Sequence, residues 1–561
     1  MTTPFSRRNF LVALAASLAP VPSIGRTAPL CQTDPAISDV NAPLTIDVHT
    51  HIFNGRDLQI RQFFAKTTVQ QGSELYPFAN AMGAVLQTLG WHLAPNAESE
   101  RRAIAQYAAE MRNCGGAETL RTLAAPAFEE GYAVGRRELQ AAAQTLNQTP
   151  QGAAVLGPKT KGGSRLEDAI RSLPPTYKGF EAKRTQPGVL GSNPTLLGYL
   201  RFILHNFNHR HVNAIDYLTT YSRNSSRKVD LVVASMVDYD WWLAQGKQTP
   251  TTLAEQVDLM GEISVLLGGR VHGFAPFCPF REAMTKGADG IGDSMRLVKR
   301  AVETQGFLGV KLYPPMGFAP WGNTGQTIWV GKPGLPAAAS DPAFGEHLDA
   351  AMETLFKYCT DNGVPIMAHS NHSNGPDKAF LDLAGSEYWS KALGKFPGLR
   401  ASFGHFGDTN LEDHQGDKSR KFLDLMSSAA GSAGANIFAD SGYFAGVLSN
   451  QSKMTQVLQT LYAASDNHVL RERLMYGTDW TMILPQKNVD DYLSDFIDVM
   501  GKVEAAQHGV TVRQTTLSNA FFGHNAAEFL GLKSGMVNRR RLETFYAANK
   551  VPEPDWMRKV G

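Results

Sequence analysis

From residue 229 onward the chain alternates short apolar stretches with helical patterns, and this rhythm restricts the fold more than any other feature. The strand-like stretches lie at 229–238, 270–277, 307–313, 364–369, 399–405, 435–443 and 473–479, and an earlier one lies at 44–51. Strands that alternate with helices at this spacing indicate βαβ units and a parallel sheet. Eight such strands predict an α/β fold of the (β/α)8 TIM-barrel type. A doubly wound open sheet is the alternative.

The first strand reads LTIDVHTH and carries His49 and His51 two residues apart. Successive strand residues point to opposite faces, so the two imidazoles emerge on the same face near the end of the strand. Two imidazoles on one face suit a divalent ion. On this stretch alone, two partly exposed strand histidines without a ligand are an equal alternative.

Polar residues also stand at the C-terminal ends of later strands, which is where a TIM barrel carries its chemistry. Lys311 lies in GVKLYPP, His369 ends IMAH, His405 ends SFGH and Asp479 ends MYGTD. The coincidence of five strand ends, including the first, is a stronger signal than any single motif. It predicts a metal centre at the mouth of the barrel.

A long stretch at 57–195 separates the first strand from the others. Its apolar spacing predicts a mostly helical insertion, with helices at 81–93, 98–114 and 127–145. Gly, Pro, Gln and Thr dominate 146–166, which predicts a loop. Because the insertion leaves the first strand directly after His51, we expect a cap beside or over the metal that restricts substrate size and excludes water. An oligomerisation arm is the alternative.

The next stretch, 196–222, predicts one long amphipathic helix that carries His205, His209 and His211. His205 and His209 are four residues apart and would share a helical face. A second metal site formed by these two histidines is one interpretation. Histidines on the polar side of an amphipathic helix are the simpler interpretation, because no carboxylate stands at a matching spacing.

Composition fits an ordinary globular protein, with 43% hydrophobic and 19% charged residues. The formal net charge is +2, and no basic run or acidic tail suggests a nucleic-acid partner. The cysteines are far apart and form no CxxC motif, which argues against a zinc knuckle or a redox pair. They are Cys31, Cys114, Cys278 and Cys359.

The N-terminus places Arg7 and Arg8 before an apolar run at 11–19. This arrangement resembles a twin-arginine (Tat) secretion signal. The resemblance implies recognition by the Tat translocation machinery and a periplasmic or secreted protein. The apolar run is too short to span a bilayer, so we expect no stable membrane anchor.

These features divide the chain into a signal peptide, a linker, a barrel in two segments, a helical insertion and a C-terminal extension. The predicted bounds are 1–26 for the signal, 27–43 for the linker, 44–56 and 196–532 for the barrel, 57–195 for the insertion and 533–561 for the extension.

The strand-end residues, together with the closing sequence LSNAFFGHNAAEFLGL at 517–532, resemble the amidohydrolase superfamily. The similarity is to its amidohydrolase-related branch, that of metal-dependent barrels of the aminocarboxymuconate-semialdehyde decarboxylase type. It covers 44–60 and 196–532, but not the insertion. It implies the same TIM-barrel fold.

By this resemblance, His49, His51, His369 and Asp479 hold zinc or another divalent ion. Such an ion lowers the pKa of a bound water toward ~7 and polarises a substrate oxygen. The resemblance also makes Asp479 and His405 the catalytic residues. Asp479 would be both ligand and proton acceptor, and His405 would be a general base or a ligand of a second ion.

Lys311 stands where binuclear members carry a carboxylated lysine that bridges two ions. The sequence is therefore compatible with one or with two metal ions per chain. A lysine that binds substrate or caps a carboxylate is the alternative. Asp47 is expected to orient a ligand or to form a structural ion pair. His272 and His524 are expected to be structural, and His372 to lie in a loop near the site.

Three functions fit these residues. The favoured one is hydrolysis of an amide, ester or lactone of a small molecule by a metal-activated water, because catabolic decarboxylation rarely needs export. Non-oxidative decarboxylation of a small carboxylate is the alternative, and a pocket arginine, for which Arg281 is the nearest candidate, would favour it. A non-catalytic metal-binding protein is the third. The sequence is also compatible with a homo-oligomer.

Overall fold

The computed structural model describes residues 42–63, 76–113, 120–148, 168, 170–184, 196–223, 225–371, 375–407, 417–428, 436–464, 469–507 and 510–560. The predicted signal peptide, nearly all of the linker and of the glycine-rich loop, and His372 lie outside these residues and stay predictions. Cys278 and Cys359 are free and buried. No helix in the described part of the chain is both long and apolar enough to cross a membrane.

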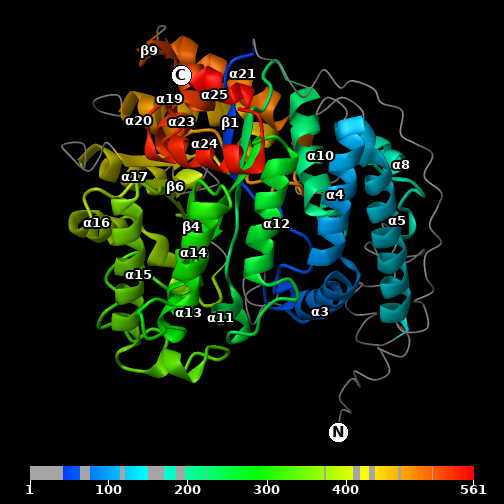
Figure 1. Ribbon diagram of the computed structural model, residues 1–561, viewed down its shortest axis with the longest axis horizontal. Coiled ribbons are helices and arrows are strands. Elements are labelled where there is room, and N and C mark those ends of the chain that lie inside the picture. The colour runs from blue at the N-terminus through cyan, green and yellow to red at the C-terminus, as the bar shows by residue number, and fades with distance from the viewer. Residues whose placement is uncertain are drawn as a thin grey trace.

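Eight parallel strands follow one another around a barrel in the order of the sequence, and Figure 1 labels β1, β4 and β6 among them. They are β1 (Ile46–Thr50), β2 (Leu231–Ser235), β3 (Val271–Pro276), β4 (Gly309–Leu312), β5 (Ile366–His369), β6 (Ala401–Gly404), β7 (Ile437–Asp440) and β8 (Leu474–Met475). The amide of Val48 donates to the carbonyl of Tyr476 at 3.2 Å, and the amide of Asp479 donates to the carbonyl of His49 at 2.7 Å. These bonds bring the first and last strands together, and the predicted (β/α)8 fold is confirmed.

Helices on the outside of the barrel connect the strands. In chain order they are α12 (Leu253–Leu266), α14 (Asp293–Thr304), α15 (Phe344–Asp361), α16 (Ser386–Lys395), α17 (Asp417–Ser428), α19 (Gln451–Ala464) and α21 (Tyr492–Ala506). The start of α12 is fixed by a capping box, in which the Thr252 side chain accepts from the Glu255 amide and Glu255 reaches back to the Thr252 amide. On α14 the buried residues Met295, Val298 and Val302 recur three and four apart, which places one apolar face against the barrel.

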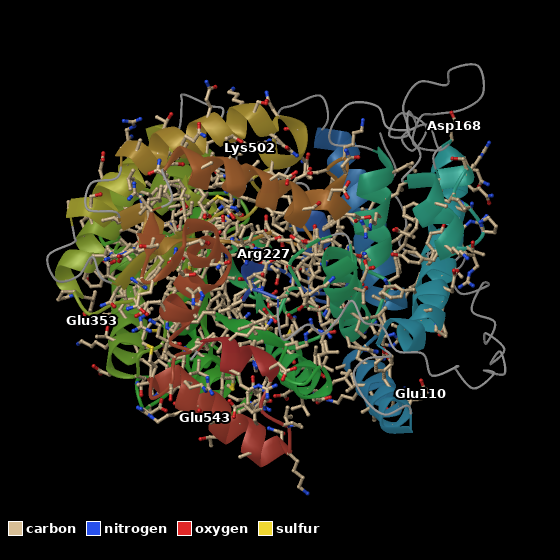
Figure 2. The ribbon with its side chains drawn as sticks, turned by 90° about the horizontal axis from the view of Figure 1, so that it is seen from above. Glu110, Asp168, Arg227, Glu353, Lys502 and Glu543 are labelled. Atoms are coloured by element: carbon tan, nitrogen blue, oxygen red, sulfur yellow. The ribbon has the colours of Figure 1, made fainter. Side chains whose placement is uncertain are left out.

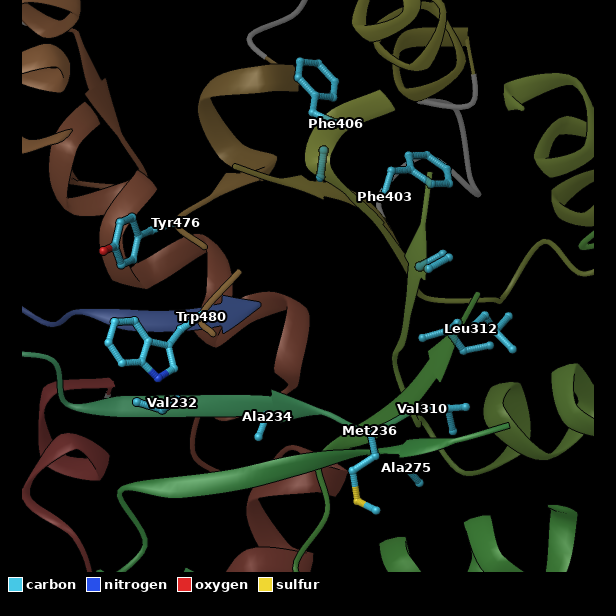
Figure 3. Packing of buried hydrophobic residues seen from close by; sticks show 14 of the residues in the cluster. Val232, Ala234, Met236, Ala275, Val310, Leu312, Phe403, Phe406, Tyr476 and Trp480 are labelled. Carbon is cyan, nitrogen blue, oxygen red and sulfur yellow. The ribbon is translucent and has the colours of Figure 1, made fainter. Parts of the chain in front are cut away.

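The main core fills the space between the strands and these helices. Figure 3 shows part of it, with Val232 and Ala234 on β2, Ala275 on β3, and Val310 and Leu312 on β4. All five side chains are buried. Tight packing of this kind tolerates little movement, so the ends of the strands are held in fixed positions.

Three C-terminal helices, α23 (Asn525–Leu530), α24 (Val537–Asn549) and α25 (Asp555–Val560), cover the N-terminal ends of the strands. The Asn538 side chain donates to the Leu308 carbonyl before β4 at 2.7 Å, and Trp556 donates to the Gly269 carbonyl before β3 at 2.9 Å. His272 lies 2.6 Å from the Tyr546 hydroxyl, which fits its predicted structural role. In Figure 1 these helices lie at the upper end of the barrel. The strand ends that carry the predicted site therefore face the opposite end.

The described part of the insertion is helical. It contains α2 (Ile60–Phe63), α3 (Tyr76–Leu93), α4 (Ala97–Asn113), α5 (Leu120–Asn147) and α8 (Tyr177–Arg184). Apolar residues of α2, α3, α5, α8 and of α9 (Leu196–His205) form a separate small core, whereas those of α4 join the main core. α4 packs along the flank of α12, where Arg101 donates to Glu262 at 2.9 Å (Figure 1). In Figure 2, Glu110 and Asp168 of the insertion lie at the edge of the molecule opposite Glu353.

A buried ionic cluster joins the insertion to the barrel. Arg210 on α10 pairs with Asp57 at the start of the insertion and with Glu100 on α4, and Asn54 donates to Glu100 at 2.8 Å. The three charged side chains are at most 2% exposed. Replacing one partner would leave a buried charge unpaired, which is strongly destabilising. The cluster therefore anchors the insertion to the barrel.

The prediction of one helix over 196–222 is wrong. The structure has two helices, α9 (Leu196–His205) and α10 (Arg210–Arg223), with a turn between them. His205 and His209 therefore do not share a helical face. The turn brings Asp216 of α10 to His205, with 3.2 Å between Nε2 and Oδ2. Spacing along a single helix cannot reveal a carboxylate that a turn brings back.

Candidate metal centre

Three of the predicted ligands meet at the mouth of the barrel. One donor atom each from His49, His51 and Asp479 lies within 4.8 Å of the other two, and all three residues are buried. The Nε2 atoms of His49 and His51 lie 3.5 Å and 3.2 Å from Oδ1 of Asp479. Two residues of the first strand thus converge with one that follows the eighth, because hydrogen bonds join these strands edge to edge.

The part of β1 that carries His49 pairs irregularly with β2. The pairing of β1 with β2 shifts between Asp47 and Thr50. Asp47, before the shift, accepts hydrogen bonds from Tyr217 of α10 at 2.5 Å and from the Thr478 hydroxyl at 2.6 Å. Desolvation raises the pKa of Asp47 to about 7, against the opposing effect of these bonds. Asp47 also accepts from the His49 amide at 3.0 Å, so it supports the backbone of a predicted ligand rather than its ring.

His49 on β1 and His51 directly after it turn their Nε2 atoms toward Asp479. Nδ1 of His49 lies 2.8 Å from Oδ1 of Asp440, and Nδ1 of His51 lies 2.8 Å from the Ser235 carbonyl. A carboxylate or a carbonyl oxygen can only accept, so Nδ1 carries the hydrogen in both rings. Nε2 of each ring is therefore the nitrogen left for Asp479 or a metal: it can donate to the carboxylate only while both ring nitrogens carry hydrogen, and it offers a lone pair to a metal once that hydrogen is lost.

Asp479 is held as an anion in this site. Burial works against ionisation, but the hydrogen bond with His51 and the nearby imidazoles of His49 and His405 together keep the pKa of Asp479 below its usual value. Its backbone is left-handed, with φ at 59°. Non-glycine residues rarely adopt this conformation outside sites that require it.

His369 and His405 form a second pair beside the first three residues. Nε2 of His405 lies 3.0 Å from Nδ1 of His369, and Nδ1 of His405 donates to the Gly442 carbonyl at 2.8 Å. Burial lowers the pKa of both histidines. In neutral rings this chain of bonds makes Nδ1 of His369 the donor and leaves its lone pair on Nε2. The structure does not group His369 with the other three ligands, so its role as a fourth ligand stays a prediction.

Lys311 lies inside the same site. Its ammonium is 3.4 Å from Nε2 of His49 and 2.8 Å from the thioether of Met367. Burial lowers the pKa of Lys311 to about 8. A bridging modification and a substrate contact are both consistent with this position.

Asp440, at the end of β7, was not among the residues predicted from the sequence. It is fully buried, and its Oδ1 atom accepts from His49, from the His405 amide at 3.1 Å and from the Gly442 amide at 3.0 Å. The signal was available, because IFAD ends an apolar strand in an acid just as the other site strands end in polar residues.

The predicted pocket arginine is already neutralised. Arg281 donates to Asp238 at 2.6 Å and to Asp240 at 2.8 Å, both just beyond β2. Gln59 of the insertion donates to Asp240 at 2.9 Å. Arg281 therefore holds the loop after β2 in place.

Aromatic rings lead from the insertion to the site. Phe63 stacks on Tyr239 with 6.0 Å between ring centroids, Tyr239 meets Tyr313 at 5.3 Å, and Tyr313 stacks on His369 at 4.2 Å. The three aromatic residues are partly exposed. They give the mouth an apolar wall to which the insertion contributes one ring.

The donor set fits a zinc-like ion. Two imidazoles that can each present Nε2 and one carboxylate are ligands that Zn²⁺ accepts, and catalytic zinc sites commonly use three protein ligands. Oxygen and nitrogen donors also suit other divalent ions.

Part of the chain matches a known family model. Residues 291–532 match the amidohydrolase family model Amidohydro_2. No curated protein matches the chain.

Several solved structures of low identity resemble the fold. A probable 2-pyrone-4,6-dicarboxylic acid hydrolase from Acinetobacter baumannii is 14% identical, with a TM-score of 0.31, and the match covers 58% of this chain and 90% of that one. A 5-carboxyvanillate decarboxylase from Novosphingobium aromaticivorans, with bound manganese, is 14% identical, with a TM-score of 0.32 and coverage of 70% and 93%. A zinc-bound amidohydrolase from Burkholderia multivorans is 12% identical, with a TM-score of 0.32 and coverage of 54% and 83%. At these scores nothing about the reaction of this chain follows from them.

The family match contains the strand ends that carry Lys311, His369, His405, Asp440 and Asp479. Residues 291–532, less than half of the chain, are therefore similar to the amidohydrolase family.

Proposed function

We propose that this protein is a metal-dependent hydrolase that cleaves an amide, ester or lactone bond of a small molecule. The observation that carries the proposal is the convergence of His49, His51 and the anionic Asp479. These residues would hold one divalent ion, with zinc the first candidate and His369 the predicted fourth ligand. When bound, such an ion activates water and polarises a substrate carbonyl.

Asp479 is the proton acceptor in this proposal. Hydrolysis requires a base at the site, and Asp479 is ionised beside both histidines of β1. His405 completes the acid–base machinery, because its ring contacts His369 and lies 4.6 Å from the ring of His49. A proton taken up by Asp479 can pass through these neighbours before it reaches the leaving group.

The pairing of Arg281 favours hydrolysis over decarboxylation. Arg281, which would have gripped a carboxylate, is paired with Asp238 and Asp240.

Decarboxylation of a small carboxylate is the second candidate, and Lys311 is the observation that favours it. A buried ammonium beside His49 would attract a substrate carboxylate. A protein that binds metal without turnover is the third candidate.

One experiment separates the three. The zinc-loaded protein is incubated in H₂¹⁸O with esters, lactones, amides and aromatic carboxylates. Hydrolysis places ¹⁸O in the product acid, whereas decarboxylation releases CO₂ and leaves ¹⁸O out of the remaining product. CO₂ release without ¹⁸O incorporation would replace the hydrolase assignment, and stoichiometric metal without turnover on any substrate would favour the binding protein. Asp479→Asn is the matched inactive control.

We also propose export by the Tat route, from Arg7 and Arg8 and the apolar run behind them. Changing both arginines to lysine should retain the protein in the cytoplasm of an expressing bacterium. Cell fractionation measures this, and unchanged export would contradict the proposal.

A further inference from the structure

We propose that Asp440 is a positioning residue that orients both His49 and His405, so that one carboxylate oxygen aligns a metal ligand and its acid–base partner. This inference deepens the proposed function and rests on it. Asp440 ends β7, and it touches the ring of one histidine and the backbone of the other.

The contact with His49 decides which nitrogen of that ring can bind a metal. Oδ1 of Asp440 lies 2.8 Å from Nδ1 of His49, and both side chains are fully buried. Water cannot replace this acceptor in so enclosed a position. The carboxylate therefore holds the hydrogen on Nδ1 and leaves the lone pair on Nε2, 3.5 Å from Asp479.

Three glycines allow the backbone to lie so close to the His49 ring that little space remains for another ring orientation. A Cβ atom built at Gly442 would lie 2.5 Å from Nδ1 of His49, one at Gly477 would lie 2.9 Å from its Cβ, and one at Gly404 would lie 3.0 Å from its Cε1. The backbones of β6, β7 and β8 thus approach the imidazole closely. With its surroundings this tight, the ring depends on Asp440 for its polar contact at Nδ1.

The same oxygen of Asp440 fixes His405. The His405 amide donates to it at 3.1 Å, and Nδ1 of His405 donates to the carbonyl of Gly442, two residues beyond Asp440. The backbone of His405 is left-handed, with φ at 65°. A non-glycine residue in this conformation is strained and persists only where its surroundings impose it.

The two carboxylate oxygens of Asp440 differ in their hydrogen bonding. Within the described part of the chain its Oδ2 atom accepts no hydrogen bond. A carboxylate kept only for stability would gain from pairing both oxygens, because a buried unpaired acceptor is costly. Instead, three donors bond to Oδ1 of Asp440. This is expected of a carboxylate whose role is to orient the groups that donate to it.

The test measures tautomer and metal affinity separately. Metal-free full-length protein is labelled with ¹⁵N-histidine, and long-range ¹H–¹⁵N correlation shows which nitrogen of His49 carries hydrogen, with assignment from His49→Ala. Zinc affinity is measured by chelator competition. Asp440→Ala should give a mixed His49 tautomer and weaken zinc binding by about 10- to 100-fold. Asp440→Asn, whose amide oxygen can still accept, should keep the Nδ1–H tautomer and bind zinc with intermediate affinity.

Asp47→Asn is the matched control. Asp47 is an equally buried carboxylate that bonds the His49 amide but not its ring, so this variant should keep the His49 tautomer. An unchanged tautomer and affinity in Asp440→Ala would overturn the proposal. If Asp440→Ala fails to fold, as circular dichroism would show, Asp440→Asn decides: wild-type affinity overturns the proposal and reduced affinity supports it.

His49→Ala separates the two levels of inference. If zinc affinity is unchanged in His49→Ala, the metal centre itself is misassigned. If His49→Ala loses zinc while both Asp440 variants keep wild-type affinity, the metal centre stands and the positioning role of Asp440 is rejected.

Discussion

Nδ1 of His369 lies 3.0 Å from Nε2 of His405, although the two residues are 36 positions apart and end different strands. The bond directs the lone pair of His369 to Nε2 and couples the predicted fourth ligand to the predicted base. Burial lowers the pKa of His369 and of His405, which favours the neutral form of both rings.

Replacement of His405 should separate metal binding from catalysis. His405→Asn should retain the ion, because the three grouped ligands are unchanged, and should lose about 10²–10⁴-fold in kcat/KM. Elemental analysis and steady-state kinetics on the same preparation measure both. Loss of metal in this variant would make His405 a ligand.

Removal of both histidines of β1 should abolish metal binding. The double variant His49→Ala, His51→Ala leaves Asp479 alone among the three grouped donors, and one carboxylate cannot retain a tightly bound ion. We expect metal content per chain, measured by elemental analysis, to fall from one to near zero. His347→Ala, at an exposed histidine on α15, is the control and should keep full occupancy. Full occupancy in the double variant would refute the ligand assignment.

The anchor between the insertion and the barrel should make stability depend on pH. Desolvation raises the pKa of Glu100 to about 7, although Arg210 opposes the shift. The folded state therefore binds a proton that the unfolded state, with a pKa of 4.5, releases. Stability from this group is full below pH 4.5 and falls as the pH rises toward 7, by at most about 1.4 kcal/mol per pH unit.

Glu100→Gln should flatten this dependence, because the amide does not titrate. Urea unfolding followed between pH 4.5 and 8 gives the slope for both proteins. The exposed substitution Glu98→Gln, on the same helix, is the control and should leave the slope unchanged. Equal slopes for wild type and Glu100→Gln would show that Glu100 is ionised throughout this range.

The insertion should affect substrate binding through Phe63. Its ring stacks on Tyr239, which meets Tyr313 beside His369. Because an aromatic pair contributes about 0.5–1.5 kcal/mol, Phe63→Ala should raise KM by roughly 2- to 13-fold with little change in kcat. Tyr388→Ala, on α16 outside the barrel, should leave KM unchanged. An unaltered KM in Phe63→Ala would argue against the predicted cap and for an arm directed away from the mouth.

The sequence by itself determined the barrel and much of the candidate site. Strands alternating with helices leave few other folds, since each apolar strand must be covered on both faces. The ends of parallel strands lie at one end of a barrel, so His49, His51 and Asp479 could be predicted to converge although more than 400 residues separate the first from the last.

The tertiary structure decided the contacts that depend on local geometry and on chain reversal. The turn after α9 brings Asp216 to His205, and the packing of α10 brings the Tyr217 hydroxyl to Asp47. Asp440 can contact both His49 and His405 only because β7 lies beside β6 and close to the ring of His49. A residue pattern fixes which strand end a side chain occupies. The hydrogen-bond partners that set tautomer and charge come from other strands and helices, and only packing in three dimensions brings them together.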